Sequence, residues 1–484
     1  MKKETEIISF PDIKAAGKRN IKEGIKVRKA DMTVPEELEK WAKGKTYCLM
    51  TSGCQANVRD SEIMDGYFAK LSMKKEEDPV KADVVLFNTC AIRENAETKI
   101  YGELGRLKKS ADENKDKIIG ICGCMAQEEK PMKFIKEHFP YVNLVFGTHN
   151  IDSLYSLLNA CITEDKRIFD VYSTQGDLVE DLPSLRTDKN KAFVNIMYGC
   201  DNFCTYCIVP YTRGRFRSRS MQDIVREVEV LKEQGYKEVT LLGQNVNAYG
   251  FDFNKEKGIG FAELLSEVAK TGIPRVRFMT SHPGYFTEDV FKVMAAYPNI
   301  MPSLHLPLQS GSDIILKRMN RHYDVATYLN LVKQVRTYIP DIALTTDIIV
   351  GFPNETEKDF EGTLDVCNKV QYDNAFTFIY SPRDGTPAAE FPDRTTKEEK
   401  SERFNRLKEC IDHYATIKAQ AEVGKIVEVL FDTVSKRDSS MISGYSRHNR
   451  LVHVKGDASL IGQIRKVRVR ESHTYSLIGE LLDE

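Results

Sequence analysis

The stretch Cys200-Asp-Asn-Phe-Cys204-Thr-Tyr-Cys207 spaces three cysteines as C-x3-C-x2-C. It follows the apolar run 193–197, which has the composition of a β-strand. Three thiolates on one loop can each bind one iron of a [4Fe–4S] cluster, which leaves the fourth iron open to an exogenous chelator. A zinc site, the alternative, would need a fourth ligand, and this loop offers no obvious further Cys or His. The spacing therefore predicts an iron–sulfur cluster at the end of a strand.

The cysteine loop opens a series in which apolar runs alternate with helical patterns. In the helical pattern 221–234, Ile224, Val228 and Leu231 recur at helical spacing. Six strand–helix units predict a partial or complete β/α barrel, whose sites lie at the carboxyl ends of the strands. A long helix is expected over 396–422. The expected strands are 193–197, 238–242, 275–279, 304–308, 342–350 and 375–380.

A second alternating series precedes the loop and predicts a parallel sheet with helices on its faces. Cys54, Cys90 and Cys124 each follow one of its strands, just before a helix. Because the carboxyl ends of parallel strands meet at one edge, we expect these thiols to converge and to bind a second cluster with an open iron. The alternative is that each is a small buried apolar side chain. The expected strands are 47–50, 84–87, 118–121 and 143–146, with helices at 57–73, 93–109 and 126–138.

The remaining cysteines have structural interpretations. Cys48 and Cys122 lie inside expected strands and are predicted to be core residues, although Cys122 is close enough to Cys124 to replace it as a ligand. Cys161, Cys367 and Cys410 lie in expected helices and are also predicted to be structural. Two histidines, His282 and His305, are each better explained as structural than as site residues when considered alone.

The flanking segments differ in composition from these two series. Residues 1–43 are polar with mixed charge and predict a flexible or loosely docked extension. Residues 163–190 are rich in Asp, Glu, Ser and Thr and predict a linker. The end of the chain has short alternating strands and predicts a small antiparallel β-barrel or sandwich. These strands are expected at 427–433, 450–454, 464–470 and 475–481.

Length and composition narrow the class of protein. The 484 residues correspond to about three domains. The 70 basic and 71 acidic residues nearly cancel, so bulk charge favours no partner. The first residues lack the apolar core of a signal peptide, and no run approaches the roughly 18 apolar residues of a membrane span. A cytoplasmic location is therefore expected, where the eleven cysteines would be reduced thiols, ligands or core residues rather than disulfides.

Positive charge is concentrated in two places. Residues 434–470 hold nine Lys/Arg against two acids, which favours contact with an RNA backbone over a merely solvated strand face. A second basic run, 213–219, either grips an RNA loop or pairs with acids in the core, and the sequence favours neither. The predicted RNA-contacting residues are Arg213, Arg215, Arg465, Lys466, Arg468 and Arg470, of which Lys466, Arg468 and Arg470 alternate along one side of a strand.

The cysteine loop resembles that of the radical S-adenosylmethionine (SAM) enzymes. Over 45–484 the chain resembles the methylthiotransferases, and three motifs are similar to those of the MiaB-type tRNA methylthiotransferases. Ala56 stands where Met is common and Asp384 where Pro is common, and neither is a ligand position. The motifs are Gly53-Cys54-Gln55-Ala56-Asn57, Asn88-Thr89-Cys90-Ala91-Ile92-Arg93-Glu94-Asn95-Ala96 and Gly243-Gln244-Asn245-Val246-Asn247.

The resemblance implies an α/β fold in three parts: a methylthiotransferase N-terminal domain over 45–163, a radical SAM core over 186–416 and a TRAM RNA-binding domain over 419–482. It implies methylthiolation at C2 of N6-isopentenyl(dimethylallyl)adenosine, position 37 of tRNA. SAM would be used twice per turnover, as radical source and as methyl donor. The SAM-chelating [4Fe–4S] cluster would be bound by Cys200, Cys204 and Cys207, and an auxiliary, sulfur-presenting one by Cys54, Cys90 and Cys124.

The resemblance also predicts contacts with SAM and further partners. Tyr206, between two ligands, is expected to pack on the adenine of SAM, and Gln309, Ser310 and Gly351 follow expected barrel strands. Plain turn chemistry explains Gly351 equally well. The expected partners are the tRNA anticodon stem-loop, a reductant protein such as flavodoxin or ferredoxin, and a sulfur donor or Fe–S carrier.

Three other hypotheses remain at this point. Two keep the chemistry but change the substrate, to threonylcarbamoyladenosine or to an aspartate of a ribosomal protein. The basic C-terminal segment argues against a protein substrate, which would need no phosphate-binding surface. The third is a non-catalytic Fe–S protein that binds RNA or senses iron, which would leave the barrel and its open-iron loop unexplained.

Overall fold

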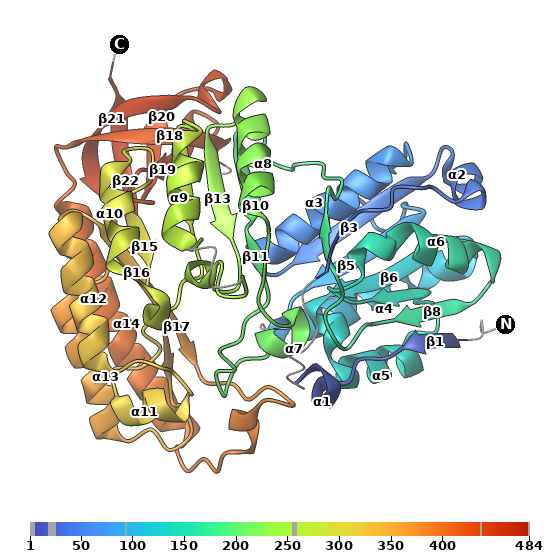
Figure 1. Ribbon diagram of the computed structural model, residues 1–484, viewed down its shortest axis with the longest axis horizontal. Helices are drawn as coiled ribbons and strands as arrows, with labels where there is room; N and C mark the ends of the chain where they lie inside the picture. The colour runs from blue at the N-terminus through green and yellow to red at the C-terminus, as the bar shows by residue number, and fades with distance from the viewer. Residues whose placement is uncertain (1–4, 18–25, 92–93, 254–258, 436–437, 483–484) are drawn as a thin grey trace. The chain divides into compact units, whose positions relative to one another are not determined.

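The computed structural model describes residues 5–17, 26–91, 94–253, 259–435 and 438–482 (Figure 1). The chain divides into two compact units. The first comprises residues 1–187, 198–201 and 208–217, and the second comprises 188–197, 202–207 and 218–484. None of the described helices combines the length and the apolar character that crossing a membrane requires.

The first unit is built on a seven-stranded parallel sheet with the strand order β1-β8-β7-β6-β5-β3-β4. Its central strands are buried along their whole length because helices cover both faces. The four strands expected from the apolar runs are confirmed as β3, β5, β6 and β7. The strands are β1 (Thr5–Ser9), β3 (Thr46–Ser52), β4 (Lys74–Lys75), β5 (Val84–Thr89), β6 (Ile118–Gly123), β7 (Leu144–Phe146) and β8 (Arg167–Asp170).

The helices of this unit pack on both faces of the sheet and create two cores. Cys122 lies in one core, where its thiol is 3.7 Å from the sulfur of Met64, and Cys48 lies in the other. Both were predicted as core residues, and both predictions are confirmed. The helices are α3 (Gln55–Lys70), α4 (Glu94–Glu113), α5 (Glu129–His138) and α6 (Leu154–Thr163), with 3-10 turns at η1 (Cys124–Gln127) and η2 (Ile151–Ser153).

Two predictions about this unit are wrong. Instead of a flexible extension, residues 1–43 contribute β1, which pairs with β8 at the edge of the sheet, and α2 (Glu36–Ala42), whose Leu38 is fully buried. Instead of a linker, 163–190 contribute β8 itself and β9 (Leu178–Glu180), which pairs with β2 (Val27–Lys29). These strands are short and are held by backbone hydrogen bonds, which require no apolar pattern. A short helix, α1 (Ile13–Ala16), follows β1.

The second unit contains a partial β/α barrel made of two three-stranded parallel sheets, β10-β13-β14 and β15-β16-β17. All six strands match expected ones. An isolated parallel bridge joins Val276 on β14 to Ile300, which precedes β15 in the chain. The strands are β10 (Lys191–Asn195), β13 (Glu238–Leu242), β14 (Arg275–Phe278), β15 (Ser303–His305), β16 (Ala343–Val350) and β17 (Asn374–Ile379).

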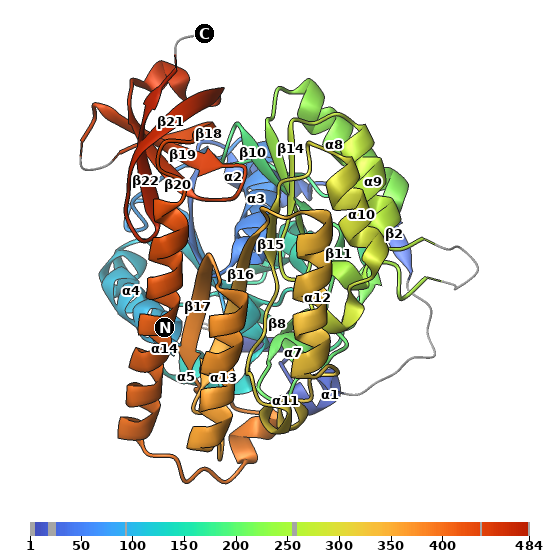
Figure 2. The ribbon, with the colours of Figure 1, turned by 90° about the vertical axis from the view of Figure 1, so that its left-hand side faces the viewer.

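Helices cover the outside of this partial barrel, and the yellow and orange ones run beside β15, β16 and β17 in Figure 2. The expected helices at 221–234 and 396–422 are confirmed as α8 and α14. The helices are α8 (Met221–Glu233), α9 (Phe261–Lys270), α10 (Glu288–Ala296), α11 (Asp313–Arg318), α12 (Val325–Tyr338), α13 (Glu357–Val370) and α14 (Lys397–Gln420).

The C-terminal strands close into a five-stranded barrel with the order β18-β19-β20-β22-β21. The expected antiparallel arrangement needs one correction, because β20 and β22 pair in parallel. The strand β19 was not predicted, since Ser443 and Gly444 interrupt its apolar pattern. A Cβ on Gly444 would lie 2.1 Å from the carbonyl oxygen of Leu430, so only glycine fits there. The strands are β18 (Ile426–Val434), β19 (Met441–Ser446), β20 (Leu451–Lys455), β21 (Ile464–Ser472) and β22 (Ser476–Leu481).

Candidate functional site: two groups of cysteines

The register of three neighbouring strands brings the first group of cysteines to one edge of the sheet. Ser52 on β3 pairs with Thr89 on β5, and Thr89 pairs with Gly123 on β6. Cys90 and Cys124 are the residues directly after Thr89 and Gly123, and Cys54 comes two after Ser52. The backbone N–H of Cys90 also donates to the carbonyl of Ser52 across 3.0 Å. The expected convergence of the three loops is therefore seen in the backbone.

Glycines before two of these cysteines allow the loops to approach closely. A Cβ on Gly53 would stand 2.9 Å from the Cβ of Cys90. Gly123 has a φ of 86°, a conformation that side chains disfavour, and a Cβ there would meet the Asn88 side chain at 2.4 Å. Glycine is thus required at both positions.

Two buried asparagines from the cysteine motifs tie the loops together. The side-chain amide of Asn57 donates to the side-chain oxygen of Asn88 across 3.0 Å. In return, the Asn88 amide donates to the carbonyl of Asn57 and to Ser61, each across 2.8 Å. Sequence reasoning read these asparagines only as parts of the family motifs. Their fully buried positions show that they fix the geometry of the cysteine-bearing turns.

Two thiols of this group, those of Cys54 and Cys124, have pKa values shifted in opposite directions. A hydrogen bond with Cys90, assisted by the charge of Arg213, lowers the pKa of Cys54 to about 5 in spite of burial. Burial raises the pKa of Cys124, and the nearby guanidinium of Arg213 opposes that rise. The thiolate is the form that ligates iron, so the lowered pKa of Cys54 favours this role for Cys54.

Arg213 is the cation of this site, at the end of the short helix α7 (Val209–Arg213). Its Nε donates to the Sγ of Cys124 across 3.2 Å, and its Nη2 forms a 2.7 Å ion pair with Asp60 on α3. Burial disfavours the charged guanidinium, but Asp60 and Cys124 outweigh it and hold the pKa of Arg213 well above its usual value. Neither Asp60 nor this role of Arg213 was found from the sequence.

Of the two arginines of the first basic run that were predicted to contact RNA, Arg213 is buried and Arg215 is partly exposed. The Arg213 side chain is only 6% exposed and is paired inside the first unit. Arg215 makes two hydrogen bonds to the carboxylate of Asp201, at 2.7 and 2.8 Å. Both arginines thus pair with acids of the protein, the alternative that the sequence left open, and contact of Arg215 with RNA stays a prediction.

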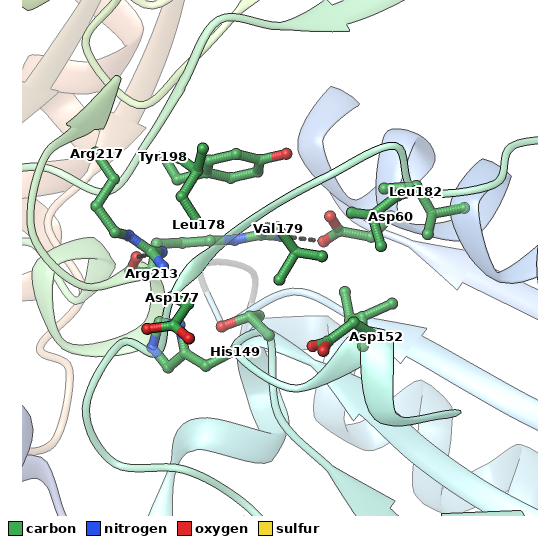
Figure 3. A pocket seen from close by; sticks show the side chains of 13 residues that line it. Asp60, His149, Asp152, Asp177, Leu178, Val179, Leu182, Tyr198, Arg213 and Arg217 are labelled. Atoms are coloured by element: carbon green, nitrogen blue, oxygen red, sulfur yellow. Dashed lines mark hydrogen bonds and ion pairs between the residues drawn. The ribbon is translucent and has the colours of Figure 1, made fainter. Parts of the chain in front are cut away.

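A small cavity of about 60 Å³ lies next to this ion pair within the first unit (Figure 3). Arg213 and Asp60 line it, and Figure 3 shows their side chains directed toward each other. Burial, together with the charges of Arg217 and Arg213, lowers the pKa of His149 well below its usual value, so the ring is neutral. Asp152 and Asp177 also line the cavity. It has room for one or two water-sized molecules.

The second group of cysteines lies on the loop after β10 and β11 (Met197–Tyr198), and the chain's division into units falls within this loop. On the side of the first unit, the N–H of Cys200 donates to the carbonyl of Gly214. On the side of the second unit, the N–H of Cys207 donates to the carbonyl of Cys204 across 2.9 Å. A guanidinium N–H of Arg321 lies 3.5 Å from the Sγ of Cys204, and Asn320 donates to two carbonyls of the loop.

The predicted SAM contacts lie around this loop within the second unit. The ring of Tyr206 packs edge-on against Phe352, which follows β16. Gln309 and Ser310 are buried after β15. The N–H of Gly351 donates to the Glu355 carboxylate across 2.8 Å, which is turn chemistry. Contact of Tyr206, Gln309, Ser310 and Gly351 with SAM stays a prediction.

The two histidines differ in role. His282 is buried, and its Nδ1 accepts from the N–H of Gly284, so its structural interpretation agrees with the geometry. His305 instead points to the same face of its sheet as Thr345 and Asp347, with its ring nitrogens 2.9 and 3.3 Å from their side-chain oxygens.

Basic residues on β21 alternate with buried ones. Val467 and Val469 are buried in the small barrel, whereas Lys466 and Arg470 are exposed and Arg468 is half-buried on the outer face. Arg470 forms an ion pair with Glu480 on β22. The expected placement of these charges on one side of a strand is confirmed. Lys436 and Arg437 of the same basic segment lie outside the described residues.

The donors of both groups have the chemistry that iron–sulfur clusters require, three cysteine thiols in each. In the described part of the chain, no three Cys, His, Asp or Glu side chains stand close enough to share one ion. Ligands of a [4Fe–4S] cluster bind different irons and stand further apart. Each group offers three cysteines, and neither Arg213 nor Arg321, the basic side chains at Cys124 and Cys204, can itself bind a metal.

Comparison with known proteins identifies three matching families along the chain. The radical SAM superfamily matches residues 194–367, the uncharacterized protein family UPF0004 matches 46–147, and the TRAM domain matches 420–482. Among solved structures, a radical S-adenosylmethionine methyltransferase, TsrM, from Kitasatospora setae has a similar fold. Its TM-score is 0.54 at 13% identity, over 72% of this chain and 75% of that one.

Curated relatives are much more similar and span nearly the full chain. The protein named tRNA-2-methylthio-N(6)-dimethylallyladenosine synthase in Geobacillus kaustophilus (strain HTA426) is 49% identical over 99% of this chain and 90% of its own length. The protein of that name in Halalkalibacterium halodurans is 46% identical over 99% of this chain and 89% of its own length. The chain therefore belongs to the family of tRNA-2-methylthio-N(6)-dimethylallyladenosine synthases.

Proposed function

We propose that this chain is a radical SAM methylthiotransferase that acts at C2 of N6-dimethylallyladenosine, position 37 of tRNA, with two [4Fe–4S] clusters. The observation that carries the proposal is the register of Ser52, Thr89 and Gly123, because it directs three cysteine-bearing turns to one sheet edge. Sulfur insertion needs a sulfur-presenting site besides the one that activates SAM. The chain offers two separate groups of three cysteines, one for each task.

Cys54, Cys90 and Cys124 hold the auxiliary cluster in this proposal. The low pKa of Cys54 favours its thiolate, and Arg213 supplies positive charge beside Cys124. Three thiolates leave one iron open for the sulfur that is to be transferred. The Asn57–Asn88 pair would keep the turns that hold this cluster in place.

Cys200, Cys204 and Cys207 hold the SAM-chelating cluster. When bound, this cluster and SAM supply the one-electron chemistry that breaks a C–H bond of the base. The protein residues orient and shield: Asn320 holds the loop carbonyls, Arg321 neutralises charge at Cys204, and Tyr206 closes the apolar side. Tyr206, Gln309, Ser310 and Gly351 contact SAM.

The tRNA anticodon stem-loop is bound through the small C-terminal barrel. Its outer face bears Lys466, Arg468 and Arg470, which match a phosphate backbone in charge, and Arg465 of the same strand is the fourth proposed RNA contact. A base in the anticodon loop is already partly unstacked. Its movement into the partial β/α barrel therefore costs less free energy than extraction of a base from a duplex. A reductant protein of the flavodoxin or ferredoxin class and a sulfur donor or Fe–S carrier complete the cycle.

Mass spectrometry of the nucleosides in total tRNA tests this function directly. Cells that lack the chain should lose the 2-methylthio derivative of dimethylallyladenosine and accumulate its unthiolated precursor. Expression of the intact chain should restore the derivative, and the Cys54→Ala and Cys204→Ala variants should not. An unchanged nucleoside profile in the deletion strain would exclude this substrate and redirect the search to threonylcarbamoyladenosine or a ribosomal-protein aspartate.

A further inference from the structure

One face of the β15-β16-β17 sheet carries two exposed phenylalanines. Asp347 on β16 pairs in register with Phe376 on β17, and Ile349 pairs with Phe378. Register partners on neighbouring parallel strands point to the same face. Phe376 is 49% exposed and Phe378 is 53% exposed, although α14 packs on this same strand. Two large aromatic side chains that are exposed on one strand indicate a surface that binds a ligand.

The opposite face of the same sheet is closed. On β16, Thr346 and Ile348 are fully buried, whereas their neighbours Asp347 and Ile349 are only partly covered. In a β/α barrel the buried face lies under the helices and the other face points to the interior. The two phenylalanines therefore belong to the interior face.

Polar groups border the aromatic pair on this face. The ring of His305 stands edge-on to Phe376, with 6.0 Å between the centroids. The same imidazole is held by Thr345 and Asp347 through its two nitrogens. The face thus combines aromatic rings with the Asp347 carboxylate, which His305 contacts through one oxygen and whose other oxygen can accept a hydrogen bond from the polar edge of a nucleobase.

The interior face continues to the loop that carries Cys204 and Cys207. Ile349 packs into the apolar cluster that includes Tyr206. Phe352 connects the ring of Tyr206 with that of Tyr380, at centroid distances of 6.5 and 5.2 Å. Tyr380 lies two residues after Phe378, about 7 Å along an extended strand. A base lying on the phenylalanines would therefore be next to the place where SAM is activated.

We propose that Phe376 and Phe378 form the binding surface for the dimethylallyl-bearing adenine, with Asp347, oriented by His305, at its polar edge. This assignment rests on the proposed function, whose substrate combines a flat base with a five-carbon apolar branch. An aromatic ring stacks on an unstacked base, and a second ring removes the apolar branch from water. Adenosine without the branch would leave one ring exposed, so this surface selects the prenylated substrate.

The test compares two synthetic anticodon stem-loops, identical except for the dimethylallyl group on the adenosine at position 37. The affinity of the cluster-loaded enzyme for each RNA is measured by fluorescence anisotropy in the presence of SAM. The wild type should prefer the prenylated RNA, and Phe376→Ala and Phe378→Ala should reduce this preference by roughly tenfold or more. Phe376→Leu and Phe378→Leu, which keep an apolar side chain, should recover part of it. Release of 5′-deoxyadenosine without RNA measures the competent fraction of each preparation.

Phe134→Ala is the matched control, because Phe134 is also a partly exposed aromatic residue but lies on α5 in the first unit. It should leave the preference at the wild-type value. If both alanine variants kept that preference, or weakened both RNAs equally, the assignment of these phenylalanines would be overturned. A wild-type enzyme without any preference for the prenylated RNA would instead count against the proposed substrate itself, so the two failures are distinguishable.

Discussion

The Nε of Arg213 donates a hydrogen bond to the Sγ of Cys124 across 3.2 Å, while the same guanidinium pairs with Asp60. Both partners of the ion pair are almost completely buried, at 6% and 4% exposure of their side chains. A buried charge is tolerated only when it is paired, so Arg213 is held in position by Asp60 and in turn orients toward the thiol. This arrangement connects α3, the turn after β6 and α7 at the proposed auxiliary cluster.

Loss of either partner of this pair should destabilise the first unit and impair the cluster. Arg213→Met leaves the Asp60 carboxylate buried alone, and Asp60→Asn does the same to the guanidinium. Each should cost about 3–5 kcal/mol, measured as the free energy of unfolding of this unit. The cluster of Arg213→Met should also have a more negative reduction potential in an EPR titration, because a donated hydrogen bond to a ligand sulfur is lost.

An exposed ion pair serves as the control for this prediction. Arg226→Ala breaks the pair with Asp223 on α8, where the Arg226 side chain is 67% exposed, and should cost less than about 1 kcal/mol. The Arg213→Met/Asp60→Asn double variant should lose less than the sum of the two single variants. Additive losses would show that the two residues do not act as a pair.

The two cysteine groups should separate two activities. Replacing Cys54, Cys90 and Cys124 with alanine should remove about half of the iron and abolish methylthiolation, while SAM cleavage to 5′-deoxyadenosine continues. Replacing Cys200, Cys204 and Cys207 should remove the other half and stop SAM cleavage as well. Iron analysis and chromatography of the products measure both. Cys410→Ser, on α14, is the control and should retain all of the iron; unchanged iron in either triple variant would refute the ligand assignment.

The sequence predicted the elements whose apolar side chains create a core and missed those held mainly by the backbone. The runs around Val85, Ile119 and Ile348 predicted central strands, because buried strands are apolar along their length. The edge strand β1 exposes Ile8 and shows no such pattern. Its partner β8 is only four residues long and lies in an acidic segment, so composition obscured it.

The candidate site could be predicted for its ligands but not for what surrounds them. Cysteine spacing and position after strands mark ligands locally. The partner of Arg213 is Asp60, which is far away in the sequence, so only the folded chain shows that this arginine is buried. A basic run in a sequence looks the same whether it faces RNA or a carboxylate. A signal was present in Asp60 itself, an acid in the second turn of the helix that directly follows Cys54.

The basic face of the small barrel should contribute to RNA affinity in a salt-dependent way. Lys466→Gln should weaken binding of the anticodon stem-loop similarly for prenylated and unmodified RNA, and should lower the slope of log affinity against log salt by about 1. Glu480→Gln should strengthen binding, because it releases Arg470 from its ion pair. Lys109→Gln, an exposed lysine on α4, should change neither quantity. An unchanged salt slope for Lys466→Gln would remove this strand from the RNA interface.

The buried carboxyl of Glu355 should make the stability of the second unit depend on pH. Burial raises the pKa of Glu355 to about 7, against the lowering effects of the Gly351 N–H and of Arg403. Between the unfolded pKa, about 4.3, and about 7, the folded state holds one more proton than the unfolded state, so stability falls as pH rises through this window. The effect is of the order of 3 kcal/mol and is complete above about pH 7.

Glu355→Gln cannot titrate, so its stability relative to wild type should improve from pH 5 to pH 8 in denaturant unfolding curves. Glu398→Gln, on the exposed first turn of α14, should show the wild-type pH dependence. A constant difference between Glu355→Gln and wild type across this range would mean that the carboxyl ionises in the folded protein as it does in water.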